Sequence, residues 1–355
     1  MSDIWRIMNI EPFGIVKIYM KRDERMGQCV FEDGTTTPNM PKLQYAIQFE
    51  IEGTTLKYLD RLNPEIAKFD NGFAFEKRDG FNLLFYEWRG QIIPKTRMRP
   101  IASKKILKLI QLPEFPLKQI KSLVRDGYIP YFEVWGTKLS KFDITHGCVD
   151  VATVQEIEGL PSLNVDVIAI MNAETRKFLP PEKWVKLALS YELYPVWLRG
   201  RYKITLENIY SLMDIMEEQN RQAGTIITEG LVLHCYDGQD YKMFKVKPHS
   251  IMHRDVVTNF IFPEDRVQQE ITKILIDVDI LEIARELDNY YELLLDYLSE
   301  DYRLLKNHKR KIRGLFLQRI ASAVRKEFPN KTYRELAELR IHKALFRFIK
   351  ELDGL

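Results

Sequence analysis

The sequence of 355 residues has only three cysteines and no apolar run long enough to cross a membrane. Cys29, Cys148 and Cys235 are far apart and odd in number, which argues against a disulfide framework and a CxxC zinc site. A membrane helix needs about 20 apolar residues, and the N-terminus lacks the basic-then-apolar order of a signal peptide. We therefore expect a cytoplasmic protein without a membrane partner.

Several enzyme signatures are also missing. The six histidines form no HExxH or HxE zinc pattern, and no GxxxxGK[ST] phosphate loop occurs. A metalloprotease, a zinc deaminase and a P-loop enzyme are therefore disfavoured.

Charge is unevenly distributed near the C-terminus, although the net charge of the chain is only +3. Residues 258–305 contain 12 Asp/Glu against 4 Lys/Arg, whereas residues 306–355 contain 14 Lys/Arg against 5 Asp/Glu. A basic end suits a polyanion such as RNA. It can equally neutralise the acidic stretch, within the chain or across a homodimer built from the C-terminal helices. Both interpretations remain open.

The spacing of apolar residues divides the chain into three parts. Residues 1–63 mix short β-rich runs with turns, which predicts a small accessory module. Residues 64–250 are dominated by strands, which we expect at 81–87, 131–135, 166–171, 226–234 and 241–246, with helices at 103–110, 116–124 and 206–221. This pattern predicts an α+β fold with mainly antiparallel pairing.

The third part, residues 251–355, is predicted to be all helical. From residue 263 onward the apolar period changes from two to between three and four. Thr332 and Glu335 have the spacing of a capping box, so we expect a final helix that starts there and continues to about residue 352.

Residues suited to nucleotide transfer lie in three separate segments. Lys77 precedes a glycine turn, Glu229 lies in an apolar strand, and Lys245 and Lys247 alternate along another strand. Side chains alternate along a strand, so the last two lysines should share a face and could meet one phosphate. Together these residues provide a nucleophile, a metal ligand and a phosphate clamp.

Five short motifs occur in order between residues 73 and 248, and the set is more specific than any single motif. They are Lys77-Arg78-Asp79-Gly80, Tyr131-Phe132-Glu133-Val134-Trp135-Gly136, Asp166-Val167-Ile168-Ala169-Ile170, Thr228-Glu229-Gly230-Leu231-Val232 and Phe244-Lys245-Val246-Lys247. Their order resembles that of ATP-dependent ligases and mRNA capping enzymes. Within that covalent nucleotidyltransferase superfamily the chain looks most like ATP-dependent RNA ligases, particularly the archaeal homodimeric family. The resemblance implies an antiparallel, ATP-grasp-like adenylyltransferase domain that uses ATP with Mg²⁺ or Mn²⁺.

The resemblance also implies roles at the reacting centre. Lys77 would attack the α-phosphorus of ATP, and we expect nearby cations, including Lys245 and Lys247, to lower its pKa. Glu229 resembles the carboxylate that helps hold a divalent metal. Its alternative role is an internal salt bridge.

Other residues would bind the nucleotide. Glu76 could accept a hydrogen bond from the adenine 6-amino group, which favours ATP over GTP. Glu133 resembles a carboxylate that contacts the ribose hydroxyls, although it too could form an internal salt bridge. Asn82 matches an asparagine of phage RNA ligases, or else stabilises the turn. Arg97 could hold a ribose or an RNA phosphate, with Arg99 as a competitor for that role.

The chain departs from the pattern on the strand at 166–171. Many ligases place an aromatic residue there to stack on adenine, but this strand has only aliphatic candidates. Ile168 and Ile170 are expected to share a face and to sandwich the base by apolar contact.

The set predicts an ATP-dependent RNA ligase. It would join RNA 5′-phosphate and 3′-hydroxyl ends through a lysyl-AMP enzyme and an adenylylated RNA end. Two alternatives remain. A DNA ligase or capping guanylyltransferase shares the motifs but usually continues into an OB domain, whereas this chain becomes helical. A catalytically inert relative would bind RNA without turnover.

Overall fold

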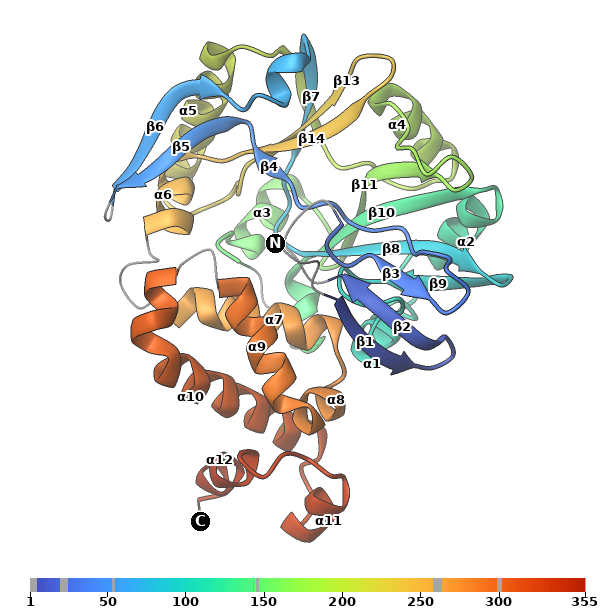
Figure 1. The fold of residues 1–355 in the computed structure, drawn as a ribbon. Helices are drawn as coiled ribbons and strands as arrows, with labels where there is room; N and C mark the ends of the chain where they lie inside the picture. Colours follow the sequence, from blue (N-terminus) through green and yellow to red (C-terminus); the bar gives the residue numbers. More distant parts are fainter. Residues whose placement is uncertain are drawn as a thin grey trace. The chain divides into compact units, whose positions relative to one another are not determined.

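The computed structural model describes residues 5–19, 25–52, 55–142, 144, 147–257, 264–298 and 302–354. The chain divides into two compact units (Figure 1). The first comprises Met1–Ala102 and Leu107–Val256, and the second comprises Ser103–Ile106 and Val257–Leu355. The three-part division at residues 63 and 250 stays a prediction. Within the described ranges, no helix is both long and apolar enough to cross a membrane.

Nine strands of the first unit form two sheets that carry the motif residues. The strands are β4 (Gln44–Tyr45), β7 (Asn71–Glu76), β8 (Phe81–Trp88), β9 (Gln91–Lys95), β10 (Tyr128–Trp135), β11 (Asn164–Asn172), β12 (Leu198–Lys203), β13 (Leu231–Tyr236) and β14 (Tyr241–Val246). One sheet has the order β11-β10-β8-β9 and the other the order β12-β7-β13-β14-β4 (Figure 1). Pairing is antiparallel except between β14 and β4. The predicted α+β, mainly antiparallel fold class is therefore confirmed.

The remaining strands come from the N-terminal part of the chain. A three-stranded antiparallel sheet is formed by β1 (Trp5–Ile10), β2 (Gly14–Tyr19) and β3 (Cys29–Phe31), and β5 (Ile47–Glu52) pairs with β6 (Thr55–Leu62). The ring of Phe13 lies 5.3 Å from that of Phe31 and 4.7 Å from that of Trp88 on β8. Aromatic packing therefore attaches the N-terminal sheet to the motif-bearing strands.

Helices connect and cover these strands. They are α1 (Lys104–Leu109), α2 (Leu117–Arg125), α3 (Val151–Glu158), α4 (Pro181–Ser190), α5 (Leu206–Ala223) and α6 (His249–Val257). The helices predicted at 103–110, 116–124 and 206–221 are confirmed by α1, α2 and α5. Helix α5 is capped by Thr205, whose side chain accepts from Asn208 N, and it buries Met213 in the same core cluster as Leu233 of β13.

The described part of the second unit is helical, as predicted. Its helices are α7 (Glu264–Asp277), α8 (Ile280–Arg285), α9 (Leu287–Leu298), α10 (Tyr302–Glu327), α11 (Tyr333–Glu338) and α12 (Leu345–Leu352). The capping box at Thr332 and Glu335 is present. The single final helix predicted from it is wrong, because α11 ends early and Arg340 adopts a left-handed φ of 59° before α12 begins.

Candidate active site

Three of the predicted residues form a compact charged cluster. Lys77 follows β7, and its main-chain N–H donates to Gly230 O at 2.9 Å. Its Nζ donates to Glu229 Oε2 at 2.5 Å, while Lys247 Nζ donates to Glu229 Oε1 at 2.7 Å. One carboxylate thus bridges the predicted nucleophile and one of the two predicted phosphate-binding lysines.

The cluster shifts the pKa values of its members. Burial opposes the charge of Lys77 most strongly, but the Glu229 and Glu133 carboxylates together outweigh it, so the pKa of Lys77 lies above its ordinary value. Lys247 acts in the predicted direction and lowers it. In this arrangement the net shift is nevertheless upward, because Glu229 bridges the two lysines. Burial also opposes the charge of Glu229, but Lys247 and Lys77 keep its pKa below the ordinary range.

A second chain of contacts joins Glu133, Asn82 and Arg97. Glu133 on β10 pairs with Asn82 on β8, which places both side chains on one face of the sheet. Asn82 Nδ2 donates to Glu133 Oε2 by a short hydrogen bond, and Arg97 Nη2 donates to Asn82 Oδ1 at 2.9 Å. Burial raises the pKa of Glu133 to about 8, although Lys77 opposes the shift. The structure thus brings three residues predicted to bind the nucleotide into one network.

Arg97 is fixed by a buried lysine that the sequence pattern did not identify. Lys95 is only 1% exposed, and its Nζ donates to the carbonyls of Gly27, Thr96 and Arg97 at 3.0, 3.0 and 3.1 Å. A Cβ on Gly27 would stand 1.7 Å from Arg97 O, and φ at Gly27 is 78°. Only glycine permits this approach. The segment that includes Gly27 therefore holds the backbone of Arg97 in place.

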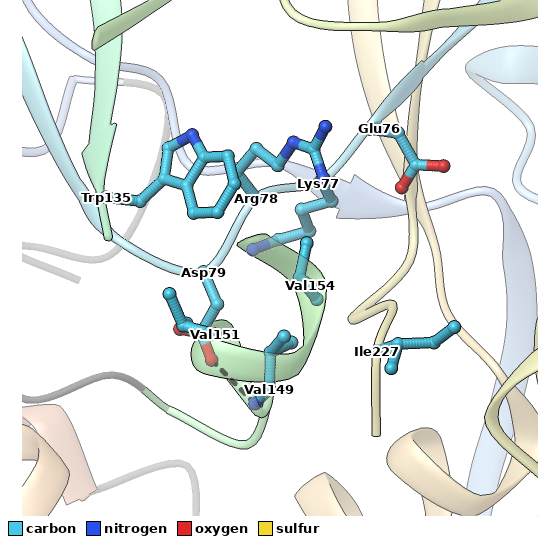
Figure 2. A pocket seen from close by; sticks show the side chains of 9 residues that line it. All are labelled: Glu76, Lys77, Arg78, Asp79, Trp135, Val149, Val151, Val154 and Ile227. Carbon is cyan, nitrogen blue, oxygen red and sulfur yellow. Dashed lines mark hydrogen bonds between the residues drawn. The ribbon is translucent and has the colours of Figure 1, made fainter. Parts of the chain in front are cut away.

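Arg78, beside the predicted nucleophile, belongs to a separate anchor. Its guanidinium donates to both carboxylate oxygens of Glu158, at 2.9 and 2.6 Å, and lies 4.7 Å from the Trp135 ring centre. Trp135 Nε1 in turn donates to Asp166 Oδ2 at 2.8 Å. Figure 2 shows Arg78 beside the Trp135 ring. The main chain on either side of Lys77 is thus fixed by buried charge and ring contacts.

Asp79 and Gly80 complete the loop. Asp79 accepts from the main-chain N–H groups of Gly147 and Val149 at 2.8 and 2.9 Å, and Figure 2 shows the bond to Val149. A Cβ on Gly80 would stand 2.2 Å from Val134 O, so the glycine is needed for close approach of two backbones. A cavity next to this loop has a volume of about 10 Å³. A cavity of this volume has room for roughly one water molecule and is too small for a nucleotide.

Glu76 lies in a different environment from Lys77. Its main-chain N–H donates to Trp197 O at 2.9 Å. Glu76 as a whole residue is 6% exposed. Its carboxylate accepts a short hydrogen bond from Arg199 Nε and a second one, at 3.3 Å, from Thr228 Oγ1. Figure 2 shows the Glu76 and Lys77 side chains projecting in different directions. An adenine 6-amino group would have to share this carboxylate with Arg199.

Lys245 packs on an aromatic ring. Lys247 Nζ contacts Glu229, whereas Lys245 Nζ lies 3.8 Å from the centre of the Tyr45 ring. Lys245 pairs with Val232 across β14 and β13. Its predicted role at a phosphate stays a prediction.

A bulge in β11 interrupts the alternation from which a shared face of Ile168 and Ile170 was predicted. β11 contains a bulge, because Phe132 pairs with Val167 while its neighbour Tyr131 pairs with Ala169, which leaves Ile168 as the extra residue. Ile170 pairs with Pro130, three residues from Glu133 on β10, so it lies on the opposite face from Glu133. It is fully buried. Only Ile168, which is partly buried, is kept as a candidate base contact.

Comparisons with known proteins identify the fold. No protein-family model and no curated protein sequence matches the chain. Among solved structures, an archaeal ATP-dependent RNA ligase in form 1 matches with a TM-score of 0.50 and 18% identity, over 90% of this chain and 84% of that chain. The chain shares the fold of that RNA ligase.

Two further solved structures match at lower TM-scores. Form 2 of the archaeal RNA ligase has a TM-score of 0.49 and 19% identity, over 86% of this chain and 75% of that chain. A putative ATP-dependent DNA ligase from Aquifex aeolicus has a TM-score of 0.45 and 15% identity, over 92% of this chain and 77% of that chain. A common fold does not determine an activity, so the function has to be argued from the site.

Proposed function

We propose that the protein is an ATP-dependent RNA ligase that acts through a lysyl-AMP intermediate. The observation that supports this most directly is the ion-paired cluster of Lys77, Glu229 and Lys247. A lysine, a carboxylate and a second cation at one point suit the transfer of a charged phosphoryl group. The fold shared with an RNA ligase agrees with this proposal.

In the first step, the Lys77 ammonium releases one proton to solvent, its neutral Nζ forms a bond to the α-phosphorus of ATP, and the nitrogen then releases a second proton to solvent. The bond between that phosphorus and the pyrophosphate oxygen breaks, and pyrophosphate leaves. Lys247 donates to the same carboxylate as Lys77, which supports a role for Lys247 in stabilising the negative charge of the departing oxygen. Because Glu229 raises the pKa of Lys77, ATP binding has to weaken that ion pair before Lys77 can act as a neutral amine.

The next two steps transfer the adenylyl group and then join the ends. An oxygen of the RNA 5′-phosphate attacks the phosphorus of lysyl-AMP, the phosphorus–nitrogen bond breaks, and Lys77 takes two protons from solvent to become an ammonium again. The RNA 3′-hydroxyl then loses its proton, attacks the 5′-phosphorus and displaces AMP. The anhydride formed in the second step thus provides the free energy for the new phosphodiester bond.

Nucleotide recognition follows from the second contact chain. Glu133 would meet the ribose hydroxyls, and Arg97 would bind a ribose or RNA phosphate, with Asn82 holding both side chains in position. Glu76 would accept from the adenine 6-amino group next to Arg199, and Ile168 would supply apolar contact to the base.

The site fits a divalent cation that would be bound partly by Glu229 and partly by phosphate oxygens of the nucleotide. In the part of the chain that the structure describes, no group of three His, Cys, Asp or Glu could hold a metal alone. Mg²⁺ commonly takes one or two carboxylates together with phosphate oxygens and water. Glu229 is the residue that would bind it, and when bound the cation supplies positive charge beside the α-phosphate.

The proposal extends to location and assembly. We place the protein in the cytoplasm, with RNA as its partner. We also propose that it forms a homodimer through the C-terminal helices and that the basic residues after 306 contribute to RNA binding.

A ligation assay tests this function. The protein would be incubated with ATP, Mg²⁺ or Mn²⁺ and a single-stranded RNA that has a 5′-phosphate and a 3′-hydroxyl, and the products separated on a denaturing gel. We expect circular or joined RNA from the wild type and none from Lys77→Ala. Joining of DNA ends in preference to RNA ends would assign the activity to a DNA ligase instead.

A further inference from the structure

A short segment between α4 and β12 exposes large aromatic side chains. Tyr194 is 76% exposed and Trp197 is 58% exposed, and Leu198 beside them is 41% exposed. Rings of this size are normally at least half buried in a folded domain. Two exposed rings within four residues of one segment indicate a surface that binds something with flat apolar faces.

This segment is attached to both sheets of the first unit. Val167 N on β11 donates to Tyr194 O at 2.8 Å, and Val196 N donates back to Val167 O at 2.9 Å. Directly after Val196, Trp197 O accepts from Glu76 N of β7 at 2.9 Å, and the chain continues into β12. Its backbone is therefore fixed, although its two rings are exposed. The main chain of Trp197 is thus hydrogen-bonded to Glu76, the residue immediately before Lys77.

The charge of the same segment has one sign. Between residues 194 and 203 the sequence contains Arg199, Arg201 and Lys203 and no acidic residue. All three side chains are exposed. Arg201 lies on the edge strand β12, with its guanidinium 5.4 Å from the Phe73 ring centre. We call residues 194–203 the aromatic edge.

We propose that the aromatic edge binds an unpaired strand of RNA and guides its end to Lys77. Bases would stack on Tyr194 and Trp197, and phosphates would contact Arg201 and Lys203. Aromatic rings interleaved with cations along a fixed backbone are the usual features of single-strand binding surfaces, because every base has a face that can stack. A duplex hides those faces, so the surface fits unpaired RNA.

The identity of the strand as a ligation substrate rests on the proposed function, because only that function requires an RNA end near Lys77. A protein partner is disfavoured by the run of cations with no acid, which suits a polyanion. Arg199 is already paired with Glu76, so it would position the segment while Arg201 and Lys203 take the phosphates.

The test measures RNA affinity without ATP. A 5′-phosphorylated 12-nucleotide RNA would be titrated by fluorescence anisotropy against the wild type, Tyr194→Ala/Trp197→Ala and Arg201→Gln. We expect the double variant to bind at least about 30-fold more weakly, the low end for losing two stacked bases. For Arg201→Gln, we expect the slope of log affinity against log salt to fall by about 0.7, as for one lost single-strand phosphate contact.

Tyr236→Ala is the matched control, because this tyrosine on β13 is also exposed, at 37%, but lies outside the aromatic edge. It should bind RNA like the wild type. The same RNA annealed to its complement should bind the wild type more weakly than the single strand does. All variants should unfold at the wild-type temperature, since the replaced rings are exposed.

Equal RNA affinity of the wild type and the double variant would overturn the proposal. So would an equal loss for single strand and duplex, or a change in solution mass of the double variant, which would mark a contact between protein copies. Because binding is measured without ATP, these outcomes are separate from the failure of the ligase function, which would appear as a wild type that never forms lysyl-AMP.

Discussion

The buried Lys95 provides a demanding test of how the site is held. Replacing it with methionine keeps the length of the side chain but removes the donor to the carbonyls of Gly27, Thr96 and Arg97. Each buried carbonyl left without a donor costs about 1 to 3 kcal/mol. Removing the buried charge recovers part of its desolvation cost, so we expect a net loss of about 3 to 5 kcal/mol in the free energy of unfolding.

Urea denaturation followed by circular dichroism would measure this loss. Lys68→Met is the control, because Lys68 forms a comparable 2.7 Å ion pair with Glu65 but its side chain is 63% exposed. Exposed pairs contribute only about 0 to 1 kcal/mol. Gly27→Ala addresses the same contact from the other side and should also destabilise, because its Cβ has no room beside Arg97 O.

The functional consequence follows from the contact chain. Arg97 is bonded to Asn82, and Asn82 to Glu133, so displacement of the Arg97 backbone should reduce AMP attachment under conditions where the variant remains folded. A loss below about 1 kcal/mol for Lys95→Met, similar to that of Lys68→Met, would refute the reasoning.

Three further predictions concern charge and assembly. Burial raises the pKa of Glu133 from 4.5 to about 8, so the folded state binds its proton more tightly and loses stability as the pH rises through that window. The unfolding free energy of Glu133→Gln should therefore increase relative to that of the wild type between pH 5 and 8. A difference that stays constant with pH would contradict this. Arg78→Met should cost about 1.5 to 3 kcal/mol by urea denaturation, because it removes both hydrogen bonds to the partly buried Glu158, whereas the exposed bidentate pair of Arg221 should cost under about 1 kcal/mol on the same change. Light scattering should give about twice the chain mass of 42.0 kDa if the C-terminal helices form a homodimer, and a monomer mass would remove that part of the proposal.

Regular alternation made much of the fold predictable from sequence. The strand predicted at 241–246 matches β14, and the one at 81–87 differs from β8 by a single residue. The strand predicted at 226–234 begins late, at Leu231, because Asn220 Oδ1 accepts from Ile227 N and Thr228 N and Gly230 has a φ of 154°. The side chain of Asn220 on α5 thus accepts the hydrogen bonds that a longer strand would have made.

The contacts within the site depended on topology and had no local signal. The partners of Glu76 and Arg78 are Arg199 and Glu158, which are 123 and 80 residues away along the chain. Likewise, the bulge that separates Ile168 from Ile170 is defined only by pairing with β10. Motif order therefore predicted which residues meet, but not which ion pairs they form or how these shift the pKa of Lys77.

The central claim is that Lys77 carries AMP, and mapping that bond tests it directly. The purified protein would be incubated with α-labelled ATP and Mg²⁺ or Mn²⁺, digested, and the modified peptide identified by mass spectrometry. We predict one adenylylated residue, Lys77, with no label on Lys77→Ala and wild-type labelling of Lys242→Ala, a lysine on β14 that pairs with Glu65 away from the cluster. Absence of covalent AMP with either metal, or its attachment to a different lysine, would contradict the account.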